Sequence, residues 1–247
     1  MTSKPSISPT LKSDEARANR LIELLPNEDF ERLSALLEFT TFKPGEILYD
    51  SGDKIRYVYF PTNSIVSLFY TMKNGATAEM GMVGSFGAVG FPVFLGGKSA
   101  PHQAVVQIAG NAFRIKAKSL QEEFLRSGPL QQILLRYTQA LITQIAQTAV
   151  CNRLHTFEQR FCRWLLLSHD RIKSDELLFT QEIISHLLGV RREGVTVAAG
   201  HLQNAGFIRY ARGHIYILDR QGLEANVCEC YQVIKEEYER LLTFQLR

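Results

Sequence analysis

Charged side chains suited to contacting the polar edges of nucleic acid bases cluster at Arg191, Arg192 and Glu193. From Arg191 to His214 the sequence holds four arginines and one glutamate, so this segment is net basic without counting histidine. A basic surface attracts the phosphate backbone, while guanidinium and carboxylate groups can hydrogen-bond to base edges. The chemistry indicated by these residues is recognition, and we expect no enzymatic activity.

The stretch from Leu178 to Asp219 predicts the elements that position these side chains. Thr180 is placed as a helix N-cap, because its hydroxyl can accept a free amide of the first turn. Apolar residues follow at helical spacing, and Gly189 ends that helix as a residue that tolerates left-handed backbone. A second helix is expected from about Arg191 to Gly206.

Two short strands are predicted after this helix, at Phe207–Tyr210 and His214–Leu218, around the turn at residues 211–213. Helix, tight turn, helix and hairpin together form a winged helix-turn-helix, whose second helix enters the DNA major groove. The competing interpretation is an ordinary helical hairpin packed on a small sheet. The length of the match favours DNA binding.

Composition sets limits on the rest of the chain. The 247 residues are 45% hydrophobic and 21% charged, as in an ordinary soluble globular protein of one or two domains. The net charge of +3 is by itself weak evidence for nucleic acid. Four unevenly spaced cysteines make no disulfide framework, and no apolar run is long enough for a signal peptide or a membrane span. We therefore expect a cytoplasmic protein without a membrane partner.

Glycine and proline divide the chain, because all eight prolines fall at or before Pro129 and ten of the 17 glycines lie between Gly45 and Gly110. Short, regularly spaced strands in this part are typical of an antiparallel β-roll or jelly roll. The predicted class is therefore α+β. The expected organisation is a mobile tail (1–12), a β-roll domain with flanking helices (13–129), a dimerisation helix (130–153), a winged helix-turn-helix domain (154–220) and one C-terminal helix (221–247).

Closely spaced glycines from Gly81 to Gly90 have two interpretations. Exposed backbone amides can form an anion-binding nest. Alternatively, the glycines form tight corners of the β-roll that need positive φ. We favour the corners, because the segment offers no clear cation to complete a phosphate site.

The helix at 130–153 carries two apolar stripes, so both must be buried. One can pack on the chain's own β domain, and the other calls for a partner. We predict a homodimer, since a helix-turn-helix that reads a palindrome needs a two-fold axis. The alternative is a helix sandwiched between two domains of one chain. The stripe assigned to the dimer interface is Leu134, Tyr137, Leu141, Ile145 and Thr148, and the other stripe is Leu135, Thr138, Ile142, Ala146 and Ala149.

This order of elements resembles the Crp/Fnr family of bacterial transcriptional regulators, most clearly in the helix-turn-helix and in KPGEILYDSGD at 43–53. The resemblance covers about residues 20–220. It implies that Arg192 takes guanine O6 and N7 and that Glu193 accepts from cytosine N4. Val197 stands where the family often has arginine. The expected base contacts are Arg191, Arg192, Glu193 and Val197, and the expected phosphate contacts are Thr180, Arg212 and His214.

The effector site departs from the family pattern for cyclic AMP, which is a glycine, a glutamate and then an arginine–serine pair. Ala88 follows Gly87 in place of the glutamate, and the stretch at 101–104 contains no such pair. We expect no cyclic AMP binding, since a phosphate pocket without these partners loses its main source of affinity. The domain then either senses an unidentified small molecule or is purely structural. The expected pocket residues are Gly87, Ala88, Val89, Gly90, His102, Gln103 and Ala104.

Cofactors are not expected. Relatives with an iron–sulfur cluster use cysteines near the N-terminus, whereas the first cysteine here is Cys151. Cys228 and Cys230 are a weak metal signal without matching ligands, and the six histidines show no spacing such as H-x-x-x-H. We predict no metal site, and a redox switch at Cys151 or Cys228 is a minor alternative.

The preferred function is a homodimeric transcriptional regulator bound to an inverted repeat in double-stranded DNA, with RNA polymerase as an expected partner. One alternative is a cyclic-nucleotide-responsive regulatory module, which would need an intact phosphate cassette. Another is an enzyme on a cupin-like roll. His102 is the only histidine in the β-roll, so a metal triad of that kind is not available.

Overall fold

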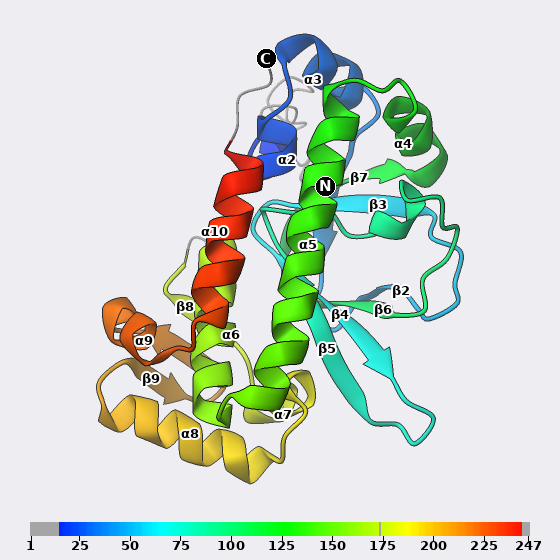
Figure 1. Ribbon diagram of the computed structural model, residues 1–247. Helices are drawn as coiled ribbons and strands as arrows, with labels where there is room; N and C mark the ends of the chain where they lie inside the picture. Colours follow the sequence, from blue (N-terminus) through cyan, green and yellow to red (C-terminus); the bar gives the residue numbers. More distant parts are fainter. Residues whose placement is uncertain (1–14, 173, 244–247) are drawn as a thin grey trace, which may run out of the picture.

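The structure, a computed structural model, describes residues 15–172 and 174–243. The predicted tail at 1–12 lies outside these residues. A β domain, a long helix and a helix-turn-helix domain follow one another along the chain, which confirms the predicted α+β class (Figure 1). Within the described part, none of the helices combines the length and the apolar character needed to cross a membrane.

Two short helices, α2 (Arg20–Glu23) and α3 (Asn27–Ser34), precede the β domain. Asn19 caps α2, and its side-chain amide donates to the carbonyls of Pro61 at 2.8 Å and Gly87 at 2.9 Å. One buried side chain therefore joins the N-terminal segment to two separate segments of the β-roll.

The β domain consists of two antiparallel sheets with strand orders β1-β7-β3 and β2-β6-β4-β5. Apolar side chains from both sheets and from the helices form one core. A single 3-10 turn, η1 (Phe91–Val93), interrupts the strand series. The strands are β1 (Glu38–Phe42), β2 (Ile47–Tyr49), β3 (Tyr57–Pro61), β4 (Ile65–Thr71), β5 (Thr77–Val83), β6 (Gln103–Ile108) and β7 (Gly110–Lys116).

The helix α4 (Ala117–Phe124) leads to the long helix α5 (Pro129–Leu154), close to the predicted bounds. Proline at the first position of α5 suits a helix start, where no partner for its missing N–H is needed. The next helix, α6 (Phe157–Arg171), begins with a capping box between Thr156 and Gln159. His155 and Thr156 therefore separate α5 from α6, the first helix of the C-terminal domain.

The glycine-rich stretch proves to be a close contact between the β-roll and the helices. A Cβ atom at Gly81 would lie 2.7 Å from the amide nitrogen of Gln144, and one at Gly84 would lie 2.6 Å from Cβ of Arg171. At Gly87 it would lie 2.7 Å from the ring of Tyr137. Of the glycines in this stretch, Gly90 alone has positive φ, 101°. The preferred interpretation, that these glycines form corners needing positive φ, thus holds only for Gly90. At the other three positions glycine is needed because the backbone lies close to α5 or α6.

The helix-turn-helix domain contains β8 (Glu176–Leu178), α7 (Gln181–Leu188), α8 (Arg192–Asn204), β9 (Ile208–Ala211) and β10 (His214–Ile217). The winged helix-turn-helix is therefore confirmed, with each boundary within two residues of the prediction. The strand β8 was not predicted, and it makes the wing a three-stranded sheet in the order β8-β10-β9. Apolar residues of β4, β5 and β6 join the core of this domain, so the two domains pack directly on each other.

The prediction of a single C-terminal helix at 221–247 is wrong. Two helices, α9 (Arg220–Asn226) and α10 (Cys230–Leu242), form instead, with a break at 227–229. Figure 1 shows α10 running beside α5, against which it packs. One side of the long helix is thus covered by the chain's own C-terminal segment. Residues 244–247 lie outside the described part.

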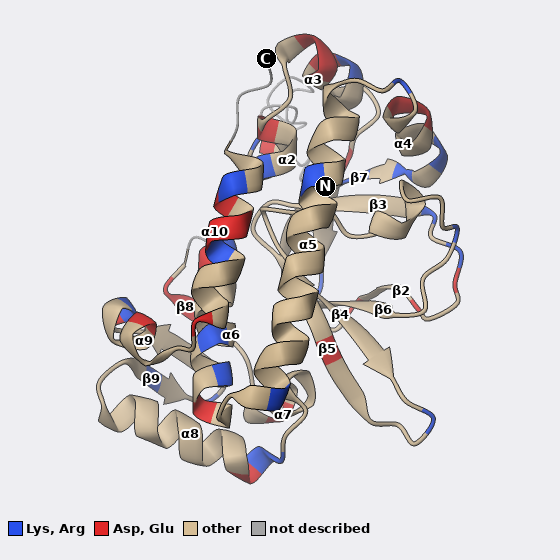
Figure 2. Ribbon diagram, viewed as in Figure 1, with Lys and Arg blue, Asp and Glu red and all other residues tan. Residues whose placement is uncertain are grey.

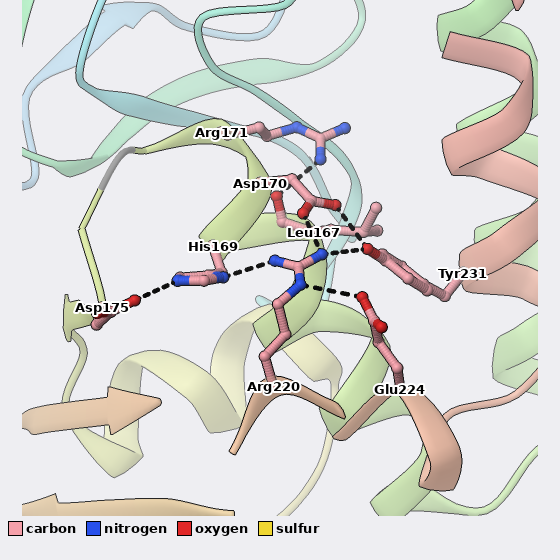
Figure 3. Close-up of polar contacts among 8 residues, drawn as sticks. All are labelled: Leu167, His169, Asp170, Arg171, Asp175, Arg220, Glu224 and Tyr231. Atoms are coloured by element: carbon pink, nitrogen blue, oxygen red, sulfur yellow. Dashed lines mark hydrogen bonds and ion pairs between the residues drawn. The ribbon is translucent and has the colours of Figure 1, made fainter. Parts of the chain in front are cut away.

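Arg220 joins α6, α9 and α10 through a polar cluster (Figure 3). Its guanidinium donates to Asp170 and to the Tyr231 hydroxyl at 2.6 Å each, and to Glu224 at 3.0 Å. It also approaches His169 Nδ1 at 2.6 Å. Hydrogen bonds to charged groups contribute more than neutral ones, so this cluster fixes the C-terminal helices against α6.

The residues predicted for the dimer interface lie inside the protomer. Leu134 and Tyr137 are fully buried and Leu141 is 1% exposed, because this stripe of α5 packs on the β domain. Thr148 is also buried, and Ile145 packs against the same core. The assignment of this stripe to a dimer interface is therefore wrong. The exposed apolar residues on α5 include Leu135 and Ile142 from the other stripe.

Candidate nucleic-acid interface

The turn between α7 and α8 is built by local backbone preferences. The Thr180 hydroxyl accepts the Ile183 amide at 3.2 Å, which confirms the predicted N-cap. Gly189 ends α7 with φ of 63°, as expected for a left-handed C-cap, and its amide donates to the Ser185 carbonyl. Arg191 is the N-cap residue of α8. The start of α8 is therefore fixed immediately after a sharp turn.

Charged side chains gather at this end of α8. Figure 2 shows the basic and acidic colours together where α8 begins, at the edge of the molecule. Arg191, Arg192 and Glu193 are all exposed. Val197, one turn further on, is 57% exposed although it is apolar. All four predicted base contacts are thus accessible on the surface of the domain.

Three predicted contact residues border one hollow between α7, α8 and the wing. Thr180, Arg192 and Arg212 line a cavity of about 470 Å³. The wing turn brings Arg212 there because Arg212 and Gly213 both have positive φ, 52° and 83°, as in a two-residue type I′ hairpin. The α7 N-terminus and the Arg212 guanidinium make this hollow a favourable place for a phosphate group, and Arg192 lines it from α8.

The remaining contact residues lie outside this hollow. Glu193 and Val197 border a second one, of about 410 Å³, beside the start of α6. His214 is exposed on the wing, where its Nδ1 lies 2.6 Å from a carboxylate oxygen of Glu176. That hydrogen bond lowers the pKa of Glu176. Glu176 therefore competes with a DNA phosphate for His214.

Two further residues belong to this surface and were not predicted. Gln181 lines the hollow with Arg192, and its side-chain oxygen accepts from the Thr196 hydroxyl at 3.0 Å. Thr196 is exposed on α8 and also bonds the Arg192 carbonyl at 3.2 Å. The sequence could have indicated both residues, because Gln181 follows the N-cap of α7 and Thr196 lies one helical turn after Arg192.

The predicted effector residues are mostly buried in the β-roll. Ala88 and Val89 are fully buried, and Ala104 is as well. The Ala88 carbonyl accepts from the Tyr137 hydroxyl at 3.0 Å, and the Val89 amide donates to the Tyr59 carbonyl at 2.8 Å. Backbone groups of this segment are therefore used within the chain, which argues against an anion nest at these atoms.

His102 occupies an aromatic environment rather than a phosphate site. The residue is 2% exposed, and its ring stacks on Phe91 with centroids 5.5 Å apart and lies 6.1 Å from the Tyr70 ring. Its Nε2 lies 3.0 Å from the Tyr49 hydroxyl. Burial lowers the pKa of His102 to about 4, so the ring is neutral near pH 7. The adjacent Gln103 donates to Asp50 at 3.2 Å and not into the roll's core.

One group of potential ligands was missed. Cys228 and Cys230 lacked matching ligands in the sequence, but the fold brings Cys151 and His155 to them. The signal was the spacing C-x-x-x-H at the end of a long helix, which places both side chains on one face. The prediction of no metal site did not take this arrangement of side chains into account.

Comparison with protein families gives two matches. The family described as "Crp-like helix-turn-helix domain" matches residues 159–226, and "Cyclic nucleotide-binding domain" matches residues 39–127. Together they cover more than half of the chain. Among curated protein sequences, none matches this chain.

Several solved structures share the fold. FixK2 from Bradyrhizobium japonicum has a TM-score of 0.67 at 17% identity, covering 78% of this chain and 98% of that one. A putative transcriptional regulator of the Crp/Fnr family from Eubacterium rectale has a TM-score of 0.64 at 17% identity, covering 83% and 96%. The c-di-GMP-responsive global regulator CLP from Xanthomonas campestris has a TM-score of 0.61 at 16% identity, covering 78% and 99%. With both domains matched in the family's order, the chain belongs to the Crp/Fnr family of transcriptional regulators.

Proposed function

We propose that this protein is a homodimeric transcription factor that reads an inverted repeat with the N-terminal end of α8. The observation that carries the proposal is the convergence of Thr180, Arg192 and Arg212 on one hollow beside that end. In this arrangement Arg192 reaches a base edge while Arg212 and the α7 N-terminus contact phosphate. Glu193 and Val197 read neighbouring bases, and RNA polymerase is the expected protein partner at the promoter.

We place the interface of the proposed dimer, and with it the two-fold axis, at the exposed apolar stripe of α5. Leu135 and Ile142 are apolar and about half exposed on this helix, and Ala146 and Ala149 continue the same stripe. A second copy of α5 would bury these side chains and would place two α8 helices for two half-sites. The β-roll packs on the opposite side of α5 and supports this geometry.

Specific binding by Arg192 is tested by selecting DNA from a random pool with the purified protein at near-physiological salt. We expect an inverted repeat whose half-site centres are separated by about one helical turn. The Arg192→Ala variant should lose about 1–3 kcal/mol of base discrimination per half-site and relax the preference at one position. Arg212→Ala should instead weaken binding to all DNA sequences alike and reduce the salt dependence of that binding.

The matched control is Arg126→Ala, because Arg126 is an exposed arginine on the surface next to α4. It should leave both the selected sequence and its affinity unchanged. Selection of the same repeat by Arg192→Ala would contradict the assignment of α8 as the reading helix.

The β-roll is proposed not to take cyclic AMP. Ala88 supplies no carboxylate for the ribose, and His102 among its aromatic neighbours supplies no charge for the phosphate. In a calorimetric titration of the full chain with cyclic AMP we expect no binding heat at micromolar ligand concentration. A saturating titration at such concentrations would overturn this part of the proposal.

A further inference from the structure

Four side chains with metal-binding atoms meet where α5 ends and α10 begins. Cys151 and His155 lie four residues apart at the end of α5, and Cys228 and Cys230 lie at the start of α10. Their three sulfur atoms and one imidazole nitrogen all lie within 4.8 Å of one another. Cys151 Sγ is 3.5 Å from Cys228 Sγ, and Cys230 Sγ is 3.6 Å from His155 Nδ1.

We propose that these four residues bind one zinc ion in a closed Cys3His site. Zn–S bonds of about 2.3 Å and Zn–N bonds of about 2.0–2.1 Å in a tetrahedron put ligand atoms about 3.5–3.8 Å apart. The two separations given above already lie at this spacing, so the widest pair needs to close by only about 1 Å. A multi-iron cluster would need wider spacing, because its ligands bind different iron atoms.

The three cysteines are not packed as ordinary core residues. Each is at most 3% exposed, yet they form a small cluster of their own that Val227 covers. Cys162, in contrast, lies in the large apolar core of the DNA-binding domain, among aromatic and aliphatic side chains. Cysteine that serves only as a small apolar residue is expected in surroundings like those of Cys162. An imidazole beside three thiols has no such role in packing.

The surroundings suit a bound cation with three thiolates. His155 Nε2 lies 3.2 Å from a carboxylate oxygen of Glu229, a contact that turns Nδ1 toward the sulfur atoms, as outer carboxylates do for metal-bound histidines. Zn²⁺ with three thiolates carries a net charge of about −1. Arg160 and Arg163 are close enough to Cys151 to interact with it electrostatically. Their Nε atoms are buried without a hydrogen-bond partner within the described chain.

The ion would connect two junctions that matter for DNA binding. His155 precedes the capping box of α6, where the DNA-binding domain starts, and Cys228 lies in the break between α9 and α10. On binding, each thiol gives its proton to the solvent and the sulfur donates an electron pair to Zn²⁺, with no change in oxidation state. Because all four ligands come from the protein, the site is structural and leaves no open coordination position.

Metal content of the full chain, purified with a reductant and without chelators, tests the proposal directly. We expect one zinc per chain by elemental analysis. After replacement of zinc by Co²⁺, we expect the thiolate-to-cobalt charge-transfer band and the intense visible bands of tetrahedral cobalt. Cys228→Ser and Cys230→Ser should lose at least about ten-fold in zinc affinity, and Glu229→Gln about 10–100-fold at unchanged stoichiometry.

Cys162→Ala is the matched control, since it removes a buried cysteine outside the cluster and should retain one zinc per chain. Wild-type protein that binds neither Zn²⁺ nor Co²⁺ after reduction would overturn the proposal, whether or not the variants fold. Iron with inorganic sulfide, or a Cys151–Cys228 disulfide in the protein as purified with no metal uptake after reduction, would overturn it as well. Loss of zinc from Cys162→Ala together with the cluster variants would also count against a site at these four residues.

Discussion

Replacing Ile142 with glutamate is expected to dissociate the proposed dimer into monomers and to lower its affinity for the proposed inverted repeat by about 10²- to 10⁴-fold. A dimer holds two reading helices at a fixed separation, so the second half-site is bound at a high effective concentration. A monomer loses this advantage although each α8 remains intact. Sedimentation velocity and DNA titration of the same samples would measure both effects.

Ile142→Glu is expected to prevent dimer formation because Ile142 belongs to a stripe of α5 that no other described part of the protomer covers. Leu135 is 47% exposed and Ile142 55% exposed, and Gln139, Ala146 and Ala149 are also exposed. Their spacing of four, three, four and three residues is the heptad pattern of helices that pair in a coiled coil. Figure 1 shows α5 flanked by α10 and the β domain, with the near side of the helix not covered by another element. A buried glutamate at this seam would carry an unpaired charge in each of the two chains, which strongly opposes association.

Ile47→Glu is the control for this change. Ile47 is 53% exposed, close to the value for Ile142, but it lies on β2, away from the helix. The same substitution there should leave the dimer and the DNA affinity unchanged. A dimer that survives Ile142→Glu would show that the two-fold axis lies elsewhere.

The helix-turn-helix was predictable because its determinants are local. Thr180 and Gly189 act within a few residues of their own positions, through a cap and a left-handed backbone, and the structure has both where the sequence indicates them. The side chains of Arg192 and Glu193 are accessible for the same reason, since the turn fixes where α8 begins. Local signals of this kind do not depend on the rest of the fold.

Long-range packing was not predictable in the same way. Periodicity showed that α5 has two apolar stripes, but it carries no information on which one faces the β domain. The decision is made by contacts such as the Tyr137 hydroxyl with the Ala88 carbonyl and the close approach of Gly87 to the Tyr137 ring. The break before α10 has no glycine or proline to mark it, and the cysteines of the proposed zinc site lie 77 residues apart along the chain, from Cys151 to Cys228.

Glu79→Gln is expected to stabilise the protein by about 3 kcal/mol at pH 8 and to have little effect at pH 4. Glu79 lies on β5 and is 9% exposed, at the point where the β domain contacts α6. Burial raises the pKa of its carboxyl group to about 7, although the Ser67 hydroxyl donates to it and the guanidiniums of Arg163 and Arg171 favour its charged form.

The sign follows from proton binding in the two states. Between pH 4.5, the ordinary pKa of the group, and about 7, the folded protein keeps the proton on Glu79 and the unfolded chain does not. The contribution of Glu79 to stability is therefore fully present below pH 4.5 and is lost as the pH rises through about 7. Glutamine has the same shape and still accepts from Ser67, but it has no charge to desolvate.

Urea unfolding of both proteins at several pH values between 4 and 8 would measure this difference. His102 has a pKa lowered to about 4 and so makes stability rise with pH between about 4 and 6.5. Because it is present in both proteins, its effect cancels when the variant is compared with the wild type at each pH. Glu122→Gln, at an exposed carboxylate on α4, is the control and should change stability by less than about 0.5 kcal/mol. A difference between Glu79→Gln and wild type that does not grow with pH would mean that Glu79 is already charged in the folded protein, with Arg163 and Arg171 close enough to outweigh its burial.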